Sequence, residues 1–322
     1  MLDKERALRG ASDEWRFLRP AGATPDARQS ATLTSVGDQI LMFGGRQGEV
    51  TFLNDTWLFD TTSCRWSCVL PSETGHGLPG SAMPAPEAYA GCPSPRWAHS
   101  AVRFGDRVLV FGGSAPGRCF NDVHWFNVAK GEWEEAPPPG AADVPAKRSG
   151  HCACAVGETM YVFGGNTTKA SFNDLWAHDV QTGIWQKIAT DGVSPPGRVG
   201  HTITALGARL FILGGREYAV SAEPRRAPFA RAAAARVARP DSHPAPPSHQ
   251  TNFFDATMHC INLRTLRWSQ VSLRSHSPSG SRAAPVRTGH CATVHAGKLL
   301  LFGGLRDDGR FLDDITTVEL IA

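Results

Sequence analysis

Residues 96–113 read RWAHSAVRFGDRVLVFGG, and this stretch contains most of a unit that recurs along the chain. It opens with Arg96 and His99, continues through an apolar run and stops at Gly112-Gly113. A short, continuously apolar run that ends at glycine is typical of a strand buried on both faces. The same stop occurs at Gly44-Gly45, Gly112-Gly113, Gly164-Gly165, Gly214-Gly215 and Gly303-Gly304. A unit that recurs in this way predicts an array of similar modules.

The other parts of the unit recur with the glycine pairs. An arginine precedes each apolar run, at Arg28, Arg96, Arg148, Arg198 and Arg287. A histidine follows three residues later in all but the first unit, which has Ala31, and these histidines are His99, His151, His201 and His290. After the glycines come Asn54-Asp55, Asn121-Asp122, Asn173-Asp174 or Asp313-Asp314. Four units then have a tryptophan, at Trp66, Trp133, Trp185 and Trp268.

These residues resemble kelch repeats, and the resemblance covers nearly the whole chain. A kelch repeat is about 50 residues long and forms one four-stranded blade of a β-propeller. The resemblance therefore implies an all-β fold, a kelch-type β-propeller with five four-stranded blades. Six blades are the alternative, but a sixth would need strands from insertions that are not strand-like in sequence. In the second unit we expect strands at residues 99–104, 106–113 and 121–127, and a fourth around Trp133.

The two ends of the chain complement each other. The last unit reaches its third strand at residues 318–320 but has no tryptophan after it. Trp15 stands near the start with no strand pattern before it, and it precedes Gly44 by the same interval as Trp185 precedes Gly214. We therefore expect the N-terminal strand to complete the last blade and close the ring, which removes exposed sheet edges.

The chain is expected to form a single propeller domain, residues 1–322, with two insertions. Residues 71–93 are rich in proline and glycine and lengthen the loop from the fourth strand of blade 1 to the first strand of blade 2. Residues 216–251 are rich in arginine, alanine and proline and lengthen the loop between the second and third strands of blade 4, where we expect them to be mobile. Because strands within a blade alternate in direction, both kinds of loop lie on one side of the ring, here called the loop face. The alternative is that surface loops simply tolerate extra length.

Positions that repeat from unit to unit are expected to serve the fold. The tryptophans should pack in the core near the glycine pairs, and the histidines should help to build the blades rather than bind metal. The Asn-Asp pairs should cap the start of the third strand through local hydrogen bonds from side chain to backbone.

Eight arginines are expected on the loop face. Five are the repeated arginines, Arg28, Arg96, Arg148, Arg198 and Arg287, and three begin loops after the glycine pairs, Arg46, Arg216 and Arg306. Charge gathered around an opening steers oppositely charged partners, and arginine binds carboxylate or phosphate groups in a bidentate manner. We therefore predict that these arginines bind a protein partner with an acidic or phosphorylated surface. The alternatives are that the repeated arginines hydrogen-bond to loop carbonyls and that the other three are solvated loop residues.

The composition argues against a membrane protein, a secreted protein and a nucleic-acid-binding protein. The net charge of the 322 residues is only +3, and no apolar run approaches the about 18 residues of a membrane span. The eight cysteines include no C-x-x-C pair, and residues 1–6 lack the apolar core of a secretory signal. We expect reduced thiols, a location in the cytoplasm or the nucleus, no membrane contact and no nucleic-acid partner.

No catalytic set is visible in the sequence, and no metal or cofactor is expected. Adjacent histidine and cysteine residues, such as His151-Cys152, point to opposite faces of a strand and cannot hold one ion. The sequence predicts a non-enzymatic protein-interaction module or scaffold subunit. The alternative is an enzyme or small-ligand binder that uses the central pocket of the propeller.

Overall fold

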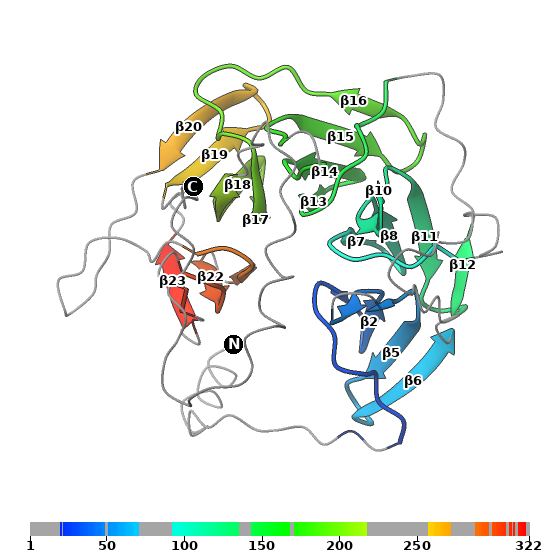
Figure 1. Ribbon diagram of the computed structural model, residues 1–322. Coiled ribbons are helices and arrows are strands. Elements are labelled where there is room, and N and C mark those ends of the chain that lie inside the picture. Colours follow the sequence, from blue (N-terminus) through cyan, green and yellow to red (C-terminus); the bar gives the residue numbers. More distant parts are fainter. Residues whose placement is uncertain are drawn as a thin grey trace, which may run out of the picture.

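The structure is a computed structural model. It describes residues 20, 22–48, 51–70, 92–134, 143–167, 171–217, 257–271, 287–295, 298–306, 309–310, 312 and 315–319. The described strands form five antiparallel sheets of three or four strands, arranged around a common centre with their first strands innermost, and two short hairpins (Figure 1). The sheets follow one another in chain order, so each is one blade of a propeller.

Four of the sheets have four strands each. Blade 1 has β1 (Thr32–Val36), β2 (Gln39–Phe43), β5 (Thr56–Asp60) and β6 (Arg65–Leu70). Blade 2 has β7 (Ser100–Phe104), β8 (Arg107–Phe111), β11 (Val123–Asn127) and β12 (Glu132–Glu134). Blade 3 has β13 (Cys152–Val156), β14 (Thr159–Phe163), β15 (Leu175–Asp179) and β16 (Trp185–Lys187). Blade 4 has β17 (Arg198–Leu206), β18 (Arg209–Glu217), β19 (Met258–Asn262) and β20 (Arg267–Val271).

Blade 5 has three described strands, β21 (Cys291–His295), β22 (Lys298–Phe302) and β23 (Ile315–Glu319). Two short hairpins lie in the loops between the second and third strands of blades 1 and 2. They are β3 (Arg46–Gln47) with β4 (Thr51–Phe52), and β9 (Ser114–Ala115) with β10 (Arg118–Cys119). The predicted all-β propeller fold is confirmed, and the strands of blade 2 fall within two residues of the predicted ranges.

Several predictions fall largely on residues that the structure does not describe. Trp15, the strand expected to close the ring, lies outside the described residues, and so do most of the two insertions. The described part of the second insertion is Arg216 and Glu217, which are the last two residues of β18 and pair with Val199 and Arg198. The strand therefore continues two residues beyond the boundary that the sequence suggested.

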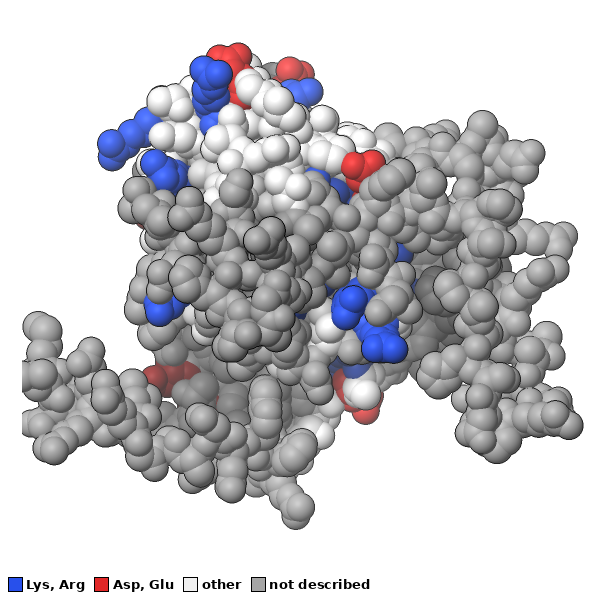
Figure 2. All heavy atoms as spheres, turned by 90° about the vertical axis from the view of Figure 1, so that its left-hand side faces the viewer, with Lys and Arg blue, Asp and Glu red and all other residues white. Residues whose placement is uncertain are grey.

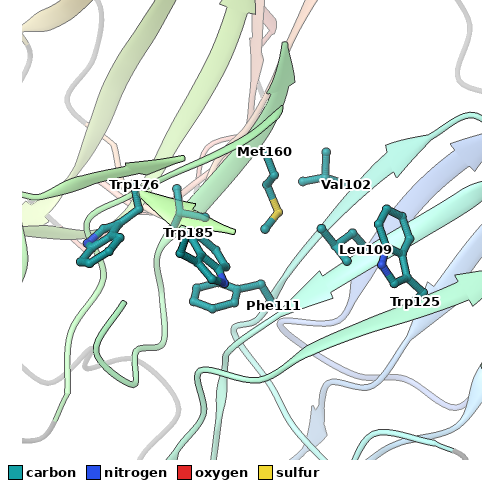
Figure 3. Close-up of a cluster of buried hydrophobic side chains, with 8 residues drawn as sticks. Val102, Leu109, Phe111, Trp125, Met160, Trp176 and Trp185 are labelled. Atoms are coloured by element: carbon teal, nitrogen blue, oxygen red, sulfur yellow. The ribbon is translucent and has the colours of Figure 1, made fainter. Parts of the chain in front are cut away.

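The apolar cores lie between neighbouring blades. Trp133, Trp185 and Trp268, from the fourth strands, pack on the phenylalanine that precedes the glycine pair of the previous blade. The ring centroids are 4.7 Å apart for Trp133 and Phe43, 4.8 Å for Trp185 and Phe111, and 5.5 Å for Trp268 and Phe163. Figure 3 shows one such cluster, with Leu109 and Phe111 of blade 2 close to Met160 and Trp185 of blade 3.

These three tryptophans lie beside the glycine pairs, as predicted. Trp66 differs, because it is half-buried and packs on Phe59 of its own blade at 5.0 Å.

The glycine pairs are required because the next blade occupies the space where a side chain would lie. Gly164 has a φ of +70°, and a Cβ there would lie 2.8 Å from Cε1 of His201 and 3.0 Å from the carbonyl oxygen of Arg198. The neighbouring Gly165 donates its N–H to that same carbonyl at 2.8 Å. A side chain would therefore push blades 3 and 4 apart.

The repeated histidines connect blades from within the core. Nε2 of His99 lies 2.9 Å from the Thr32 hydroxyl of the previous blade, and Nε2 of His151 lies 3.0 Å from the Ser100 hydroxyl. His290 meets Thr202 in the same way at 3.1 Å, while Nε2 of His201 lies 3.2 Å from the carbonyl oxygen of Phe163. Burial lowers the pKa of His99 and His201 to about 3, so these rings are neutral at physiological pH. The predicted structural role of the histidines is supported by these contacts.

A series of backbone hydrogen bonds links the blades around the centre. The N–H of Ala98 donates to the carbonyl of Ser30, Gly150 to Ala98, Gly200 to Gly150 and Gly289 to Gly200, at 2.7 to 3.2 Å. Among the described residues, the series does not continue from Ser30 back to Gly289, and Ala31 stands where the other blades have histidine. The described residues therefore show four blade junctions of one kind, and closure of the ring by the N-terminal strand stays a prediction.

Candidate functional site: the loop face

The arginines that precede the first strands are buried in the fold. Arg148 is fully buried, and its guanidinium donates to both carboxylate oxygens of Asp174 at 2.8 and 3.0 Å. It also donates to the carbonyls of Gly164 at 3.0 Å and Ala146 at 3.1 Å, and it lies 4.4 Å from the ring centroid of Phe172. Burial raises the pKa of Asp174, but the hydrogen bonds and charge of Arg148 outweigh it, so the pKa lies below its usual value.

The same arrangement recurs in the other blades. Arg96 donates to the two carboxylate oxygens of Asp122 at 2.7 and 2.8 Å, and Arg28 forms an ion pair with Asp55. Arg198 and Arg287 donate to the carbonyls of Gly214 and Gly303 at 2.9 and 3.0 Å. We call these five residues, Arg28, Arg96, Arg148, Arg198 and Arg287, the frame arginines. In the structure they hydrogen-bond to loop carbonyls, as the alternative interpretation stated, and their guanidinium groups are not available to a partner.

The aspartates of the Asn-Asp pairs have a different role from the one predicted. The expected local caps are not the main contacts of Asp55, Asp122 and Asp174, whose carboxylates bind frame arginines that precede them by 26 or 27 residues. Asp174 does have one local bond of the expected kind, to its own backbone. Asp174 also accepts from the indole N–H of Trp176 at 2.7 Å, and Asp122 contacts His124 Nε2 at 2.9 Å. These carboxylates neutralise the buried guanidinium groups. The pairing is needed because a charge removed from water is costly unless an opposite charge compensates it.

Between the frame residues lies a set of positions that vary from blade to blade. The residue after each frame arginine pairs in antiparallel fashion with the residue after the glycine pair. The five pairs are Gln29 with Arg46, Trp97 with Ser114, Ser149 with Asn166, Val199 with Arg216 and Thr288 with Leu305. We call these ten residues the mouth ring, because they lie next to the turns whose backbone bonds link neighbouring blades near the centre.

The other three predicted arginines lie at or beside this ring and are half-buried. Arg46 stacks on Trp97, with its guanidinium carbon 4.1 Å from the centroid of the indole. Arg216 is strand-paired opposite Val199, and Arg306 lies in a turn in which its N–H donates to the carbonyl of Arg310 at 2.9 Å. These three residues, Arg46, Arg216 and Arg306, are here called the mouth arginines.

Sequence reasoning missed two residues of this region. Trp97 was not singled out, although its position after a frame arginine is occupied by a different residue type in every blade. Arg118, in β10, lies 4.9 Å from the ring centroid of Phe120, and Arg96 lies 4.3 Å from the same ring. Arg118 could have been found from the sequence, because it lies in the loop between the second and third strands of blade 2, on the loop face.

The described residues offer no arrangement for metal chemistry and no broad basic surface on the side of the ring shown in Figure 2. No group of three or more His, Cys, Asp or Glu side chains in the described part of the chain is placed to hold a metal ion. On that side, the described Lys and Arg side chains lie in small separate groups, several beside acidic ones. None of the eight cysteines, all of which are described, forms a disulfide bond in the structure. No helix able to span a membrane occurs in the described residues.

Comparison with known proteins agrees with this architecture. Residues 7–215 match the model of the KLHDC2/KLHL20/DRC7 Kelch-repeats domain. The chain therefore belongs to the kelch-repeat family, whose blades the repeated frame builds.

Related proteins share parts of the chain at low identity. Kelch domain-containing protein 3 of Homo sapiens is 28% identical over 286 residues, which cover 86% of this chain and 64% of that protein. Acyl-CoA-binding domain-containing protein 4 of Arabidopsis thaliana is 27% identical over 177 residues, or 55% of this chain and 24% of that protein. Host cell factor 2 of Homo sapiens is 25% identical over 330 residues, or 94% of this chain and 36% of that protein. The matches span about a quarter to two thirds of these relatives.

Proposed function

We propose that this kelch domain is a protein-interaction module that binds an acidic or phosphorylated segment of a protein partner on its loop face. Arg46, Arg216 and Arg306 are the proposed contacts, and the frame arginines are excluded because the fold uses their guanidinium groups. Kelch-repeat proteins generally act as interaction modules. We place the domain in the cytoplasm or the nucleus, where its thiols stay reduced.

One observation carries the proposal. Arg46 is half-buried and held against Trp97, yet no described carboxylate forms an ion pair with it. The frame arginines Arg28, Arg96 and Arg148 each have an aspartate. A guanidinium that the fold positions without neutralising it is suited to an anionic group from outside.

The test is a pull-down with mass spectrometry that compares the wild type with Arg46→Ala/Arg216→Ala/Arg306→Ala. The matched control is Arg65→Ala/Arg103→Ala/Arg264→Ala, which removes the same charge from exposed arginines near the turns of the opposite face. We expect the mouth variant to lose its partners and the control variant to keep them, with a steep salt dependence of the wild-type complex. Equal capture by all three proteins would overturn the proposal.

A further inference from the structure

Of the mouth positions, the junction between blades 1 and 2 has the most fully formed contact site. Gln29 and Arg46 exchange two backbone hydrogen bonds of 3.0 Å in blade 1, and Trp97 exchanges two with Ser114 in blade 2, also at 3.0 Å. The bond of 3.1 Å from the N–H of Ala98 to the carbonyl of Ser30 ties the two turns together. Gln29, Arg46 and Trp97 are therefore held at their backbone by hydrogen bonds within each blade and between the two blades.

The described residues around the Arg46 guanidinium leave one edge for a ligand. One face of the group stacks on the indole of Trp97 at 4.1 Å. With the Gln29 amide oriented to present its oxygen, that oxygen accepts from Nε at 3.2 Å and Nη2 at 3.3 Å. The remaining N–H groups belong to Nη1 and to the outer side of Nη2, which form the end of the guanidinium fork. This end has the spacing that binds both oxygens of a carboxylate.

The local charge favours a carboxylate over a phosphate. Arg28 and Arg96, the frame arginines of the same two blades, are already paired with Asp55 and Asp122. Arg46 is thus a single positive charge without a described counter-ion, and it matches one Asp or Glu side chain. A phosphoryl group with a charge near −2 is suited to several arginines together.

Trp97 adds an apolar requirement next to the charge. It is half-buried, and it is the one aromatic residue at this position among the five blades, which otherwise have Gln29, Ser149, Val199 and Thr288. Trp and Arg are the residue types that most often dominate the energy of an interface. The part of the indole not covered by Arg46 offers a surface for an apolar side chain next to the bound acid.

We infer that Gln29, Arg46 and Trp97 form a composite site that binds an Asp or Glu side chain with an apolar neighbour from an extended protein segment. The inference rests on the proposed function and deepens it, because it assigns the main contact to one junction and the ligand to carboxylate chemistry. Arg46 supplies the charge, Gln29 orients it, and Trp97 holds it and contacts the neighbouring side chain.

The experiment uses a phage-displayed library of random peptides, selected on the full chain. We expect the wild type to enrich peptides that pair Asp or Glu with an apolar residue. The selected peptide, labelled for fluorescence anisotropy, should bind Arg46→Ala at least about tenfold more weakly, and Arg46→Lys should recover only part of the loss because lysine has no fork. Trp97→Ala should weaken binding strongly, and Trp97→Phe should weaken it less. Both variants are first checked for an unchanged melting temperature. The losses of Arg46→Ala and Trp97→Ala should not add in the double variant.

Changes to the peptide separate the two anion chemistries. Replacing its acid by Asn or Gln should abolish binding, and replacing it by phosphoserine should weaken it. A phosphoserine peptide that binds more tightly would overturn the carboxylate assignment. Binding that is lost in Arg216→Ala/Arg306→Ala but unchanged in Arg46→Ala and Trp97→Ala would overturn this site and leave the proposed function standing. Failure to enrich any acidic peptide would count against both.

Discussion

Arg148 and Arg46 lie in loops of the same face, but their guanidinium groups have different surroundings. Arg148 is fully buried and bonded to Asp174 and to two carbonyls, whereas Arg46 is half-buried between Trp97 and Gln29. The position of Arg148 is occupied by arginine in every blade. The position of Arg46 is occupied by arginine in only two of the five blades. Residues that repeat in every blade build the junctions, and residues that vary between blades are the ones that we propose for binding.

The largest effect we expect is acid destabilisation of the junctions. The repeated histidines are neutral in the fold because burial lowers their pKa, to about 3 for His99 and His201 and about 4 for His290. An unfolded histidine titrates near 6.5, so their contribution is complete above pH 6.5 and is lost as the pH falls toward the folded pKa. Each such histidine should remove about 1.4 kcal/mol from the free energy of unfolding per pH unit in that window.

Urea unfolding between pH 7 and pH 4.5 measures this effect. The folded pKa values of Asp122 and Asp174 are lowered by their arginines, and an unfolded aspartate titrates at about pH 3.9, so the loss of their contribution falls mainly below this window. The variant His201→Asn should reduce the slope of the free energy of unfolding against pH by the equivalent of about one proton. A free energy of unfolding that is constant from pH 7 to pH 4.5 would show that the histidines are not buried and neutral.

Arg148→Ala should be a strongly destabilising substitution of a frame arginine. It leaves the largely covered Asp174 carboxylate without its guanidinium, and breaking a buried ion pair in this way typically costs about 3–5 kcal/mol. The free energy of unfolding by urea measures the loss, and Arg46→Ala is the matched control on the same face. Equal stability of the two variants would remove the distinction between frame and mouth arginines.

Gly164→Ala tests the contact between blades 3 and 4. Any side chain at its φ of +70° costs about 1–2 kcal/mol, and the overlap with His201 and the Arg198 carbonyl should add about 1–3 kcal/mol. The control is Gly157→Ala, at a φ of +58° with nothing within 4 Å of the added Cβ, which should show the backbone cost alone. Thermal unfolding of both variants gives the difference, and equal melting temperatures would mean that the blades yield at no cost.

Arg46→Ala/Arg216→Ala/Arg306→Ala should have the smallest effect on stability. Substitutions on the surface usually change the free energy of unfolding by less than about 0.5 kcal/mol each, and none of the three mouth arginines is fully buried. The melting temperature of the triple variant should therefore stay close to that of the wild type. A large drop would place these residues with the frame and would remove them as binding contacts.

The blades were predictable from sequence because each one repeats the same local signals. The second strands ended at the glycine pairs in four of the five blades, and the spacing of Trp133, Trp185 and Trp268 located the fourth strands and their packing. The extension of β18 through Arg216 was not visible, because a strand that continues past a glycine pair breaks the pattern that the other blades follow.

The partners of the polar residues were not predictable in the same way. Asp122 binds Arg96 across 26 residues of chain, and only the fold brings the two together. The stack of Arg46 on Trp97 joins two blades, and neither residue type recurs in every blade at its position, so no pattern could pair them. Repetition located the frame, but contacts between varying positions required the structure.

The most direct test of the division between frame and mouth is chemical modification of native protein by phenylglyoxal, followed by peptide mapping. Arg46 and Arg216, which are half-buried, should react, whereas Arg96 and Arg148, which are fully buried and paired, should be protected until the protein unfolds. Reaction of Arg148 in native protein at the rate of Arg46 would contradict the account.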